Sequence, residues 1–441
     1  MATQHQLQSF PSKPRVFILS DISNEPDDAE SLVRYLLYAN QFRTEGLVAC
    51  TSTWMKNKVC PQDMHKIING YEKVVDNLNA HVHPNDPYPT PQYMRSLIKK
   101  GAESYGMTAV GPDIPLSEGA QHLLDTATHR AKLRIYTISD QDDTGTWLRT
   151  TYPDLFYICS VHGWCQYGMA AWTGISGDAW YGFDQGGPDA SKISAEWIRE
   201  HIQIGPLERA RCRREPGVRV LGGRYIRTDA SGTGVANGHF SDTPDEVVGL
   251  DGRRHKSNQA TVWRWRDAFQ TDFAARMQWS LSGDVARANH HPVAVVNGSV
   301  GPAPLVLEVP AGGVVRLDAR ASYDPDPEDC ITFKWYQYKD PSATQWSVQH
   351  EVGELGIRLL DEAGSVIEVT VPPAEKCCVE LISRKAIARG QLLHLILEVK
   401  DNGSPSLITY RRVLIQATNE ELVGGGGGAE AIGDTMRDVI R

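Results

Sequence analysis

Residues 15–37 read RVFILSDISNEPDDAESLVRYLL, and this stretch decides the fold. The run VFIL at residues 16–19 is wholly apolar, which is typical of a strand buried on both faces of a parallel sheet. After a polar turn, leucine and valine recur four residues apart between residues 32 and 37, which predicts a helix. Asp27 and Asp28 lie in its expected first turn, where acidic side chains suit the positive end of the helix dipole.

The same alternation of strand and helix continues to residue 288. Further inner strands are predicted for three apolar runs, at residues 46–50, 133–138 and 155–159. Apolar residues at helical spacing predict two long helices, at residues 64–78 and 266–281. Strand, loop and helix in succession predict an α/β domain with a doubly wound, mostly parallel sheet over residues 15–288.

The composition changes near Asn289, where short β-type runs begin to alternate with turn sequences such as DPDP at residues 324–327. Six such runs are predicted strands, at residues 293–296, 314–317, 331–338, 366–371, 392–399 and 410–417. This spacing predicts an antiparallel β-sandwich of immunoglobulin-like architecture over residues 292–420. We expect residues 1–14 to be a disordered N-terminus, and residues 421–441, which include five consecutive glycines, to be a flexible tail.

The amino-acid composition of the chain limits which partners it is expected to bind and in which cellular compartment we expect it. The 441 residues include 45 Lys and Arg against 54 Asp and Glu, a net charge of −9, which argues against a nucleic acid polymer or an anionic membrane as partner. No apolar stretch reaches the length of a spanning helix, and the first residues do not resemble a secretory signal. The eight cysteines are scattered. We therefore expect a cytoplasmic protein with a small-molecule substrate, whose sandwich either shapes the cleft or makes homodimer contacts.

The loop from Asp21 to Asp28 carries the strongest chemical signal. It places four carboxylates within eight residues, directly after a predicted strand. Ligands of doubly wound sheets bind at the carboxyl ends of strands, and carboxylates this close repel one another unless a cation or a proton is present. Helix capping accounts for Asp27 and Asp28 but not for Asp21. We therefore predict a site in which Asp21, Glu25 and Asp28 are catalytic.

The loop resembles the signature of the nucleoside hydrolases, in which a strand is followed by Asp, a short gap, and Asp-Asp at the start of a helix. More closely, the chain resembles the nucleoside-hydrolase-like proteins described as cellulose-binding, which join such a domain to a β-sandwich. The matching stretches are residues 21–28 with 31–34, 45–48, 136–143, 172–177 and 263–270. These stretches are specific for the family and much less so for an activity.

The resemblance implies a chemistry and a metal. In nucleoside hydrolases the loop holds a Ca²⁺ that grips the ribose diol and activates a water. By position, Asp21, Asp27 and Asp28 match acidic places of that motif, and Asp21 and Asp28 would be ligands if a metal is bound. The place of the calcium ligand and general base is Ser23 here, a poor base, which leaves Glu25 as a candidate for that role. Two loops of the family also look shortened, between residues 125 and 133 and between 206 and 222.

Other candidates follow predicted strands on the same rim. His162 is a candidate general acid, and its structural alternative is an ordinary loop histidine. The substrate-binding candidates are Asn24, Asp27, Thr53, Trp54, Asp140, Asp143 and Trp172. The tryptophans offer stacking faces, although core packing is their usual role. The aspartates at 140 and 143 offer oxygens to complete a metal site, or else begin a helix.

Three functions stay open at this point. The first is hydrolysis of a nucleoside or glycoside through the Asp21–Asp28 loop, with or without Ca²⁺. The second is a repurposed enzyme of small-molecule (secondary) metabolism that carries out isomerisation, cyclisation or lyase chemistry without metal. The third is a carbohydrate-binding protein without catalysis. The absence of phosphate-loop, dinucleotide-binding, esterase and zinc-protease motifs excludes those classes.

Overall fold

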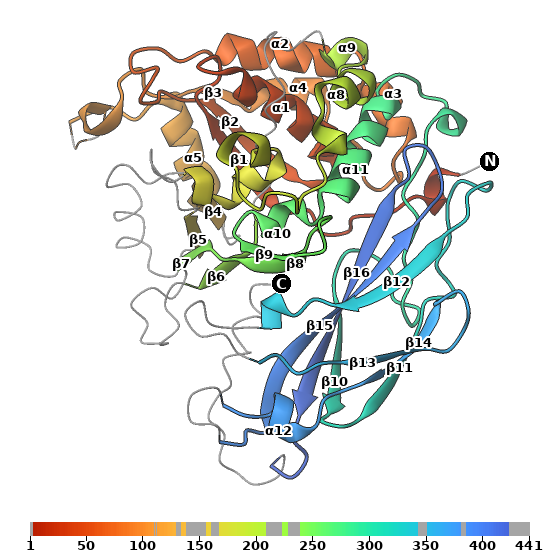
Figure 1. The fold of residues 1–441 in the computed structure, drawn as a ribbon. Coiled ribbons are helices and arrows are strands. Elements are labelled where there is room, and N and C mark those ends of the chain that lie inside the picture. Colours follow the sequence, from red (N-terminus) through yellow and green to blue (C-terminus); the bar gives the residue numbers. More distant parts are fainter. Residues whose placement is uncertain are drawn as a thin grey trace. The chain divides into compact units, whose positions relative to one another are not determined.

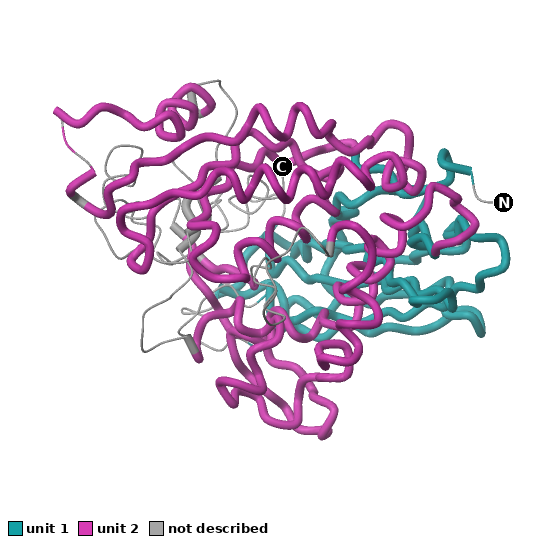
Figure 2. Tube along the Cα trace, turned by 90° about the horizontal axis from the view of Figure 1, so that it is seen from above, with its two compact units in different colours: residues 1–10, 289–441 teal, residues 11–288 magenta. Residues whose placement is uncertain are grey.

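The computed structural model describes residues 3–109, 111, 113–128, 134–137, 156–159, 167–208, 223–227, 239–342, 351–380 and 385–422. The chain divides into two compact units, residues 11–288 and residues 1–10 with 289–441 (Figure 2). Within the described residues, no helix combines the length and the apolar character that a membrane crossing requires.

The first sheet of the 11–288 unit is parallel, with strand order β1-β2-β3 (Figure 1). Its strands are β1 (Arg15–Ser20), β2 (Arg43–Ala49) and β3 (Ile98–Lys100). Ser20 pairs with Ala49, and Ala49 pairs with Lys100. The carboxyl ends of all three strands therefore meet at one edge, and the loops that follow them begin side by side.

Helix α1 (Pro26–Tyr38) begins as the sequence predicts. Pro26 occupies its first turn, where its missing N–H costs nothing, and two acidic residues follow. The face that includes Leu36 and Leu37 is fully buried. Helix α11 (Arg266–Trp279) packs against α1, and the buried Arg276 of α11 donates to the Leu37 carbonyl at 2.9 Å.

The predicted helix over residues 64–78 is two helices, α2 (Pro61–Tyr71) and α3 (Val75–Ala80). Between them, the amides of Lys73 and Val74 bond three residues back rather than four, which tightens the chain and ends α2. Gly70 in the last turn of α2 weakens the helix at this point. The apolar stripe continues across the break because both helices bury it.

The remaining helices of this unit are short. They are α4 (Pro91–Ser96), α5 (Glu118–Thr128), α7 (Asp178–Tyr181), α8 (Ala195–His201), α9 (Gly205–Glu208) and α10 (Ala260–Trp263). The 3-10 helices are η2 (Ala39–Gln41), η3 (Gly106–Ala109), η4 (Tyr167–Met169), η5 (Ala171–Ile175), η6 (Ser191–Ile193) and η7 (Val285–Arg287). Helix α5 packs against β2 and β3, where Gly119 lies so close to the Val48 side chain that a Cβ would collide with it.

The described residues of this unit form two further sheets. One has the order β4-β5-β7-β6, with β6 antiparallel to β7 and the other pairs parallel. Its strands are β4 (Arg134–Thr137), β5 (Phe156–Cys159), β6 (Tyr225–Arg227) and β7 (His239–Asp242). The other is the hairpin of β8 (Asp245–Val248) and β9 (Arg254–Ser257). The α/β architecture with parallel sheets is confirmed.

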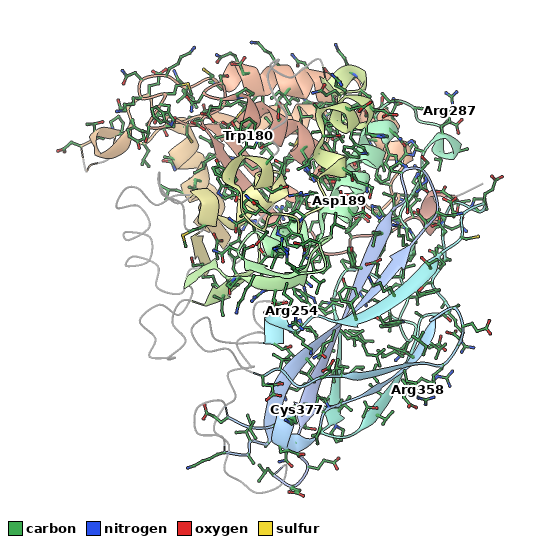
Figure 3. All side chains as sticks on the ribbon, in the orientation of Figure 1. Trp180, Asp189, Arg254, Arg287, Arg358 and Cys377 are labelled. Atoms are coloured by element: carbon green, nitrogen blue, oxygen red, sulfur yellow. The ribbon has the colours of Figure 1, made fainter. Side chains whose placement is uncertain are left out.

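The C-terminal unit is a β-sandwich, as predicted. One sheet has the order β10-β16-β15-β12 and the other β11-β14-β13, and an apolar core fills the space between them. The strands are β10 (Leu305–Pro310), β11 (Val314–Asp318), β12 (Thr332–Gln337), β13 (Gly356–Leu359), β14 (Val366–Thr370), β15 (Arg389–Lys400) and β16 (Ile408–Thr418). Helix α12 (Ala374–Cys377), which carries Cys377 in Figure 3, and η8 (Asp340–Ser342) lie between strands.

Four details of this unit differ from the prediction, the first being that strand β13 was not predicted. Residues 293–296 form isolated bridges rather than a strand. Strand β10 was not predicted; it pairs parallel with β16, so the sandwich is not wholly antiparallel, and its edge position accommodates Pro310. The N-terminal residues, predicted to be disordered, include η1 (Gln4–Gln6), and the Tyr323 hydroxyl donates to the Gln6 carbonyl at 3.0 Å.

Candidate functional site

The predicted catalytic loop begins at the shared edge of the first sheet. The Cys50 amide donates to the Ser20 carbonyl at 2.8 Å, and the Gly101 amide donates to the Ala49 carbonyl at 2.9 Å. Asp21 is thus the first residue beyond the sheet in the loop after β1, and the β2 loop begins beside it, with the β3 loop on the far side of β2. This edge is where doubly wound sheets bind their ligands.

Asp28 is the central group of the loop. Its carboxyl accepts a hydrogen bond from the Ser20 hydroxyl at 2.6 Å and lies within hydrogen-bonding reach of the carboxyl of Asp21. Burial is the largest cause that raises the pKa of Asp28 to about 7; the Ser20 bond opposes it, and the charges of Asp21 and Asp27 add to it. Two carboxyl groups share a hydrogen bond only when one of them is protonated, so the pair holds a proton near neutral pH.

Cys50 contacts the same region and is missing from the sequence prediction. Burial, followed by the charges of Asp21 and Asp28, raises the pKa of its thiol to about 11. Cys50 therefore stays a neutral thiol beside the acidic pair at physiological pH. In the sequence, Cys50 is the last residue of the strand predicted over residues 46–50, and a lone cysteine at a strand end is a weak signal.

A second unpredicted residue reaches the loop from helix α2. The Ser23 hydroxyl donates a short hydrogen bond to Asp63, and Lys66 donates to the other oxygen of that carboxyl at 2.5 Å. The position to which the resemblance assigns the general base is therefore occupied by a hydroxyl that is bound to a carboxylate 40 residues further along the chain. No spacing within the sequence indicates this pair.

The other loop candidates lie at the helix start. Asn24 closes a turn through its amide, which donates to the Asp21 carbonyl at 3.0 Å. Glu25 is the exposed N-cap residue of α1, and its side chain makes no capping bond. Asp27 is half-buried in the first turn. Glu25 is thus exposed to solvent at the start of the helix, and its catalytic role stays a prediction.

The β2 loop holds an aromatic face at this edge. The hydroxyls of Thr53 and Tyr105 are hydrogen-bonded at 2.5 Å, which ties the β2 loop to the β3 loop. Lys56 lies 5.9 Å from the centre of the Tyr105 ring. Next to Thr53, Trp54 is 65% exposed. Thr53 and Trp54 therefore lie in the loop after β2, which begins beside the loop that carries Asp21.

Among the described residues, the structure does not show any of the remaining candidates at this edge. Trp172 lies in η5 and is only 6% exposed, beside a small apolar cluster of Ala171, Ile175 and Val262. A stacking platform needs an accessible face, so its binding role stays a prediction. His162, Asp140 and Asp143 lie outside the described residues.

The loop carboxylates do not form a three-ligand metal set. Among the described residues, the group of three or more acidic, histidine or cysteine side chains whose ligand atoms lie within 4.8 Å of one another is Asp324, Asp326 and Asp329, in the C-terminal unit. This aspartate triad could hold a metal ion, and the sequence indicated only a turn there. A Ca²⁺ at Asp21 and Asp28 would need further ligands, so no step proposed below passes through a metal.

The aspartate triad makes the stability of the C-terminal unit depend on pH. Burial, aided by the charges of Asp401, Asp326 and Asp329, raises the pKa of Asp324 to about 7. The folded chain then binds this proton more tightly than the unfolded chain does, so stability falls as pH rises from about 4 through 7. In chelator, Asp324→Asn should raise the free energy of unfolding at pH 8 by roughly 1–2 kcal/mol, after allowance for solvent screening, and leave it unchanged at pH 4.

Thermal unfolding at the two pH values measures this difference. Glu362→Gln, which removes an exposed carboxylate from the same unit, is the control and should change neither value. Equal stabilisation by Asp324→Asn at pH 4 and pH 8 would show that the effect is not electrostatic.

The fold and the loop define a nucleoside hydrolase-like domain followed by a β-sandwich. Two family models match the chain: "Cellulose-binding Sde182, nucleoside hydrolase-like domain" over residues 15–132 and 124–214, and "Cellulose-binding protein Sde0182, C-terminal domain" over residues 314–417. The chain belongs to this family of nucleoside hydrolase-like proteins described as cellulose-binding.

One solved structure is similar over nearly the whole chain. It is a nucleoside hydrolase-related hypothetical protein from Saccharophagus degradans that is described as associated with carbohydrate metabolism, with 25% identity, a TM-score of 0.67, and coverage of 92% of this chain and 100% of that one. Human CDH23 EC21-23 matches 29% of this chain and 35% of its own, at 16% identity and a TM-score of 0.19. No curated protein matches the chain.

Proposed function

We propose that the 11–288 unit hydrolyses the glycosidic or N-glycosidic bond of a small sugar-containing molecule, with Asp28 as general acid and Asp21 as its carboxylate partner. The observation that carries this proposal is the Ser20–Asp28–Asp21 arrangement at the carboxyl end of β1. The carbohydrate class is supported by the family description and by the description of the Saccharophagus degradans protein.

The proposed reaction uses both carboxyl groups of the pair, Asp28 and Asp21. Asp28 in its acid form donates its proton to the departing oxygen or nitrogen as the bond to the anomeric carbon breaks. The carboxyl group of Asp21 faces the positive charge that develops on the sugar ring. Water then adds to the anomeric carbon, and its proton returns to the carboxyl pair. The products are a free sugar and a protonated leaving group.

The pKa of Asp28 matches this role. An acid that is half-protonated near pH 7 loses its proton readily enough to help the leaving group and still holds it at physiological pH. Because only the protonated form acts, the rate should fall as pH rises above about 7. A calcium ion at Asp21 and Asp28 stays a prediction of the family resemblance, which calorimetry with Ca²⁺ would test.

The test is a product assay with the full chain. Nucleosides, aryl glycosides and cello-oligosaccharides are incubated with the protein, and free sugar is detected by chromatography and mass spectrometry. The proposal expects release of a sugar that has gained one water. Conversion of a compound without gain of water would instead favour isomerisation or lyase chemistry, and a panel left wholly intact would count against catalysis.

Trp54 is proposed to stack on the sugar or on the leaving group. Trp54→Ala should raise KM about tenfold and leave kcat within about twofold, because stacking on an aromatic face stabilises bound substrate and transition state alike. Leu359→Ala, which removes another exposed apolar side chain (58% exposed) from the C-terminal unit, is the control. An unchanged KM for Trp54→Ala would remove it from the site.

Binding without catalysis is a second candidate function. It is favoured by the exposure of two tryptophans, Trp54 and Trp180, the latter 80% exposed on α7 (Figure 3). Aromatic faces of this kind pack on the C–H faces of sugar rings. Co-sedimentation with insoluble cellulose tests this function, and loss of binding in a Trp54→Ala and Trp180→Ala double variant would support it.

A further inference from the structure

The turn that carries Asp21 contains a backbone conformation that serine rarely adopts. The Asn24 amide closes a β-turn on the Asp21 carbonyl, and Ser23, its third residue, has a φ of +80°. This is the φ of the third residue in a type II turn, where glycine or asparagine normally stands. Among the described residues other than glycine, only one aspartate and one asparagine share a positive φ, and both types tolerate it better than serine does.

One carboxylate outside the loop holds Ser23 in this conformation. Asp63, in the first turn of α2, accepts the Ser23 hydroxyl and is itself bound by Lys66. Burial opposes ionisation of Asp63, but the hydrogen bonds from Lys66 and Ser23 outweigh it and hold the pKa of this carboxyl below its usual value. Asp63 is therefore a charged acceptor, and such hydrogen bonds are about twice as strong as neutral ones.

From this geometry we propose that Asp63 is a positioning residue: it holds Ser23 in the left-handed conformation and so fixes the Asp21 carboxyl against Asp28. Its effect on catalysis rests on the function proposed above. The hydrogen bond by which Asp63 holds Ser23 and the turn, here called the clamp, does not depend on that function. Without Asp63, the strained serine relaxes toward negative φ and the turn rotates Asp21 away from its partner. A shift of about 1 Å in a reacting group can lower a rate by about a hundredfold.

If the clamp holds the turn, a second substitution at Ser23 should restore the activity that is lost when Asp63 is removed. A simple loss of charge at Asp63 would not be corrected in this way. In Asp63→Ala, exchange of the Asn24 amide should accelerate at least about tenfold, because its bond to Asp21 opens. kcat should fall by roughly 10- to 100-fold with little change in KM. Adding Ser23→Gly should return both values to within about threefold of the wild type, because glycine adopts positive φ without a clamp.

Hydrogen exchange of peptides that cover residues 20–27 and steady-state kinetics on the full chain measure these effects. Asp76→Ala, which removes an exposed carboxylate from the first turn of α3, is the matched control and should change neither readout. Ser23→Ala, which removes only the hydroxyl, gives the same prediction as Asp63→Ala and replaces it if that variant misfolds. Unchanged exchange in both, or a double variant no better than Asp63→Ala, would overturn the clamp. A wild type that releases no sugar would overturn the proposed function instead, and exchange would still decide the clamp.

Discussion

Asp28→Asn is expected to lower kcat for sugar release by roughly 10²–10⁴-fold while KM changes by less than about threefold. The amide keeps the shape of the side chain and can still accept the Ser20 hydroxyl. It cannot transfer a proton to a leaving group. The loss should be largest for substrates with a poor leaving group and small for aryl glycosides whose leaving group departs without protonation.

The control for Asp28→Asn is Asp76→Asn, which removes a first-turn carboxylate from α3 rather than α1. Its kcat should equal that of the wild type. In the wild type, the rate with a poor leaving group should decline above about pH 7, and this limb should be absent from the residual activity of Asp28→Asn. A variant that keeps full activity toward poor leaving groups would exclude Asp28 as the acid.

Arg276→Met is expected to lower the free energy of unfolding of the 11–288 unit by about 3–5 kcal/mol. Arg276 is 3% exposed and donates to the Leu37 carbonyl, the Tyr88 hydroxyl and the Asp272 carboxylate, at 2.9, 3.2 and 2.9 Å. Methionine retains the aliphatic volume but leaves the Asp272 carboxylate without its buried cation. It also removes one of the two donors to the Leu37 carbonyl, which keeps the Tyr88 hydroxyl at 2.7 Å. The site depends on this contact because Leu37 belongs to α1, whose first turn carries Asp28.

Urea unfolding of the full chain measures the loss as a shift of the midpoint by roughly 1–2 M. Arg287→Met is the control, since Arg287 is an exposed arginine in η7 (Figure 3) and its loss should change stability by less than about 0.5 kcal/mol. Equal midpoints for Arg276→Met and Arg287→Met would show that the buried guanidinium contributes nothing.

The fold was predictable where local pattern and tertiary structure agree. The apolar run before Asp21 predicted a strand, and the proline and acidic residues after it predicted a helix start, so β1 and α1 lie where the pattern indicates. The predicted burial of this strand on both faces is wrong among the described residues, because β1 is an edge strand of the first sheet and Leu19 is 58% exposed. The break between α2 and α3 was not predictable, because both helices bury the same stripe and periodicity alone cannot distinguish one helix from two. Strand β10 escaped prediction because it ends in a proline that only an edge position tolerates.

The candidate site also has one part that was predictable from the sequence and one part that was not. The loop from Asp21 to Asp28 was visible because its residues are adjacent in sequence. The contribution of Asp63 was not, because it depends on a hydrogen bond between residues 40 positions apart and on a φ value that no composition reveals. Trp54 and Trp172 looked equivalent as aromatic candidates, yet one is exposed at the sheet edge and the other is buried. Burial is set by the fold as a whole, not by the motif that contains the residue.

The proposed mechanism requires the acidic loop after β1 to hold a proton at neutral pH. The most direct measurement is a titration of the aspartate carboxyl carbons by ¹³C NMR in the wild type, with Asp28→Asn used to assign the Asp28 signal. We expect an Asp28 transition near pH 7. A transition near pH 4, where an ordinary solvated aspartate titrates, would contradict it.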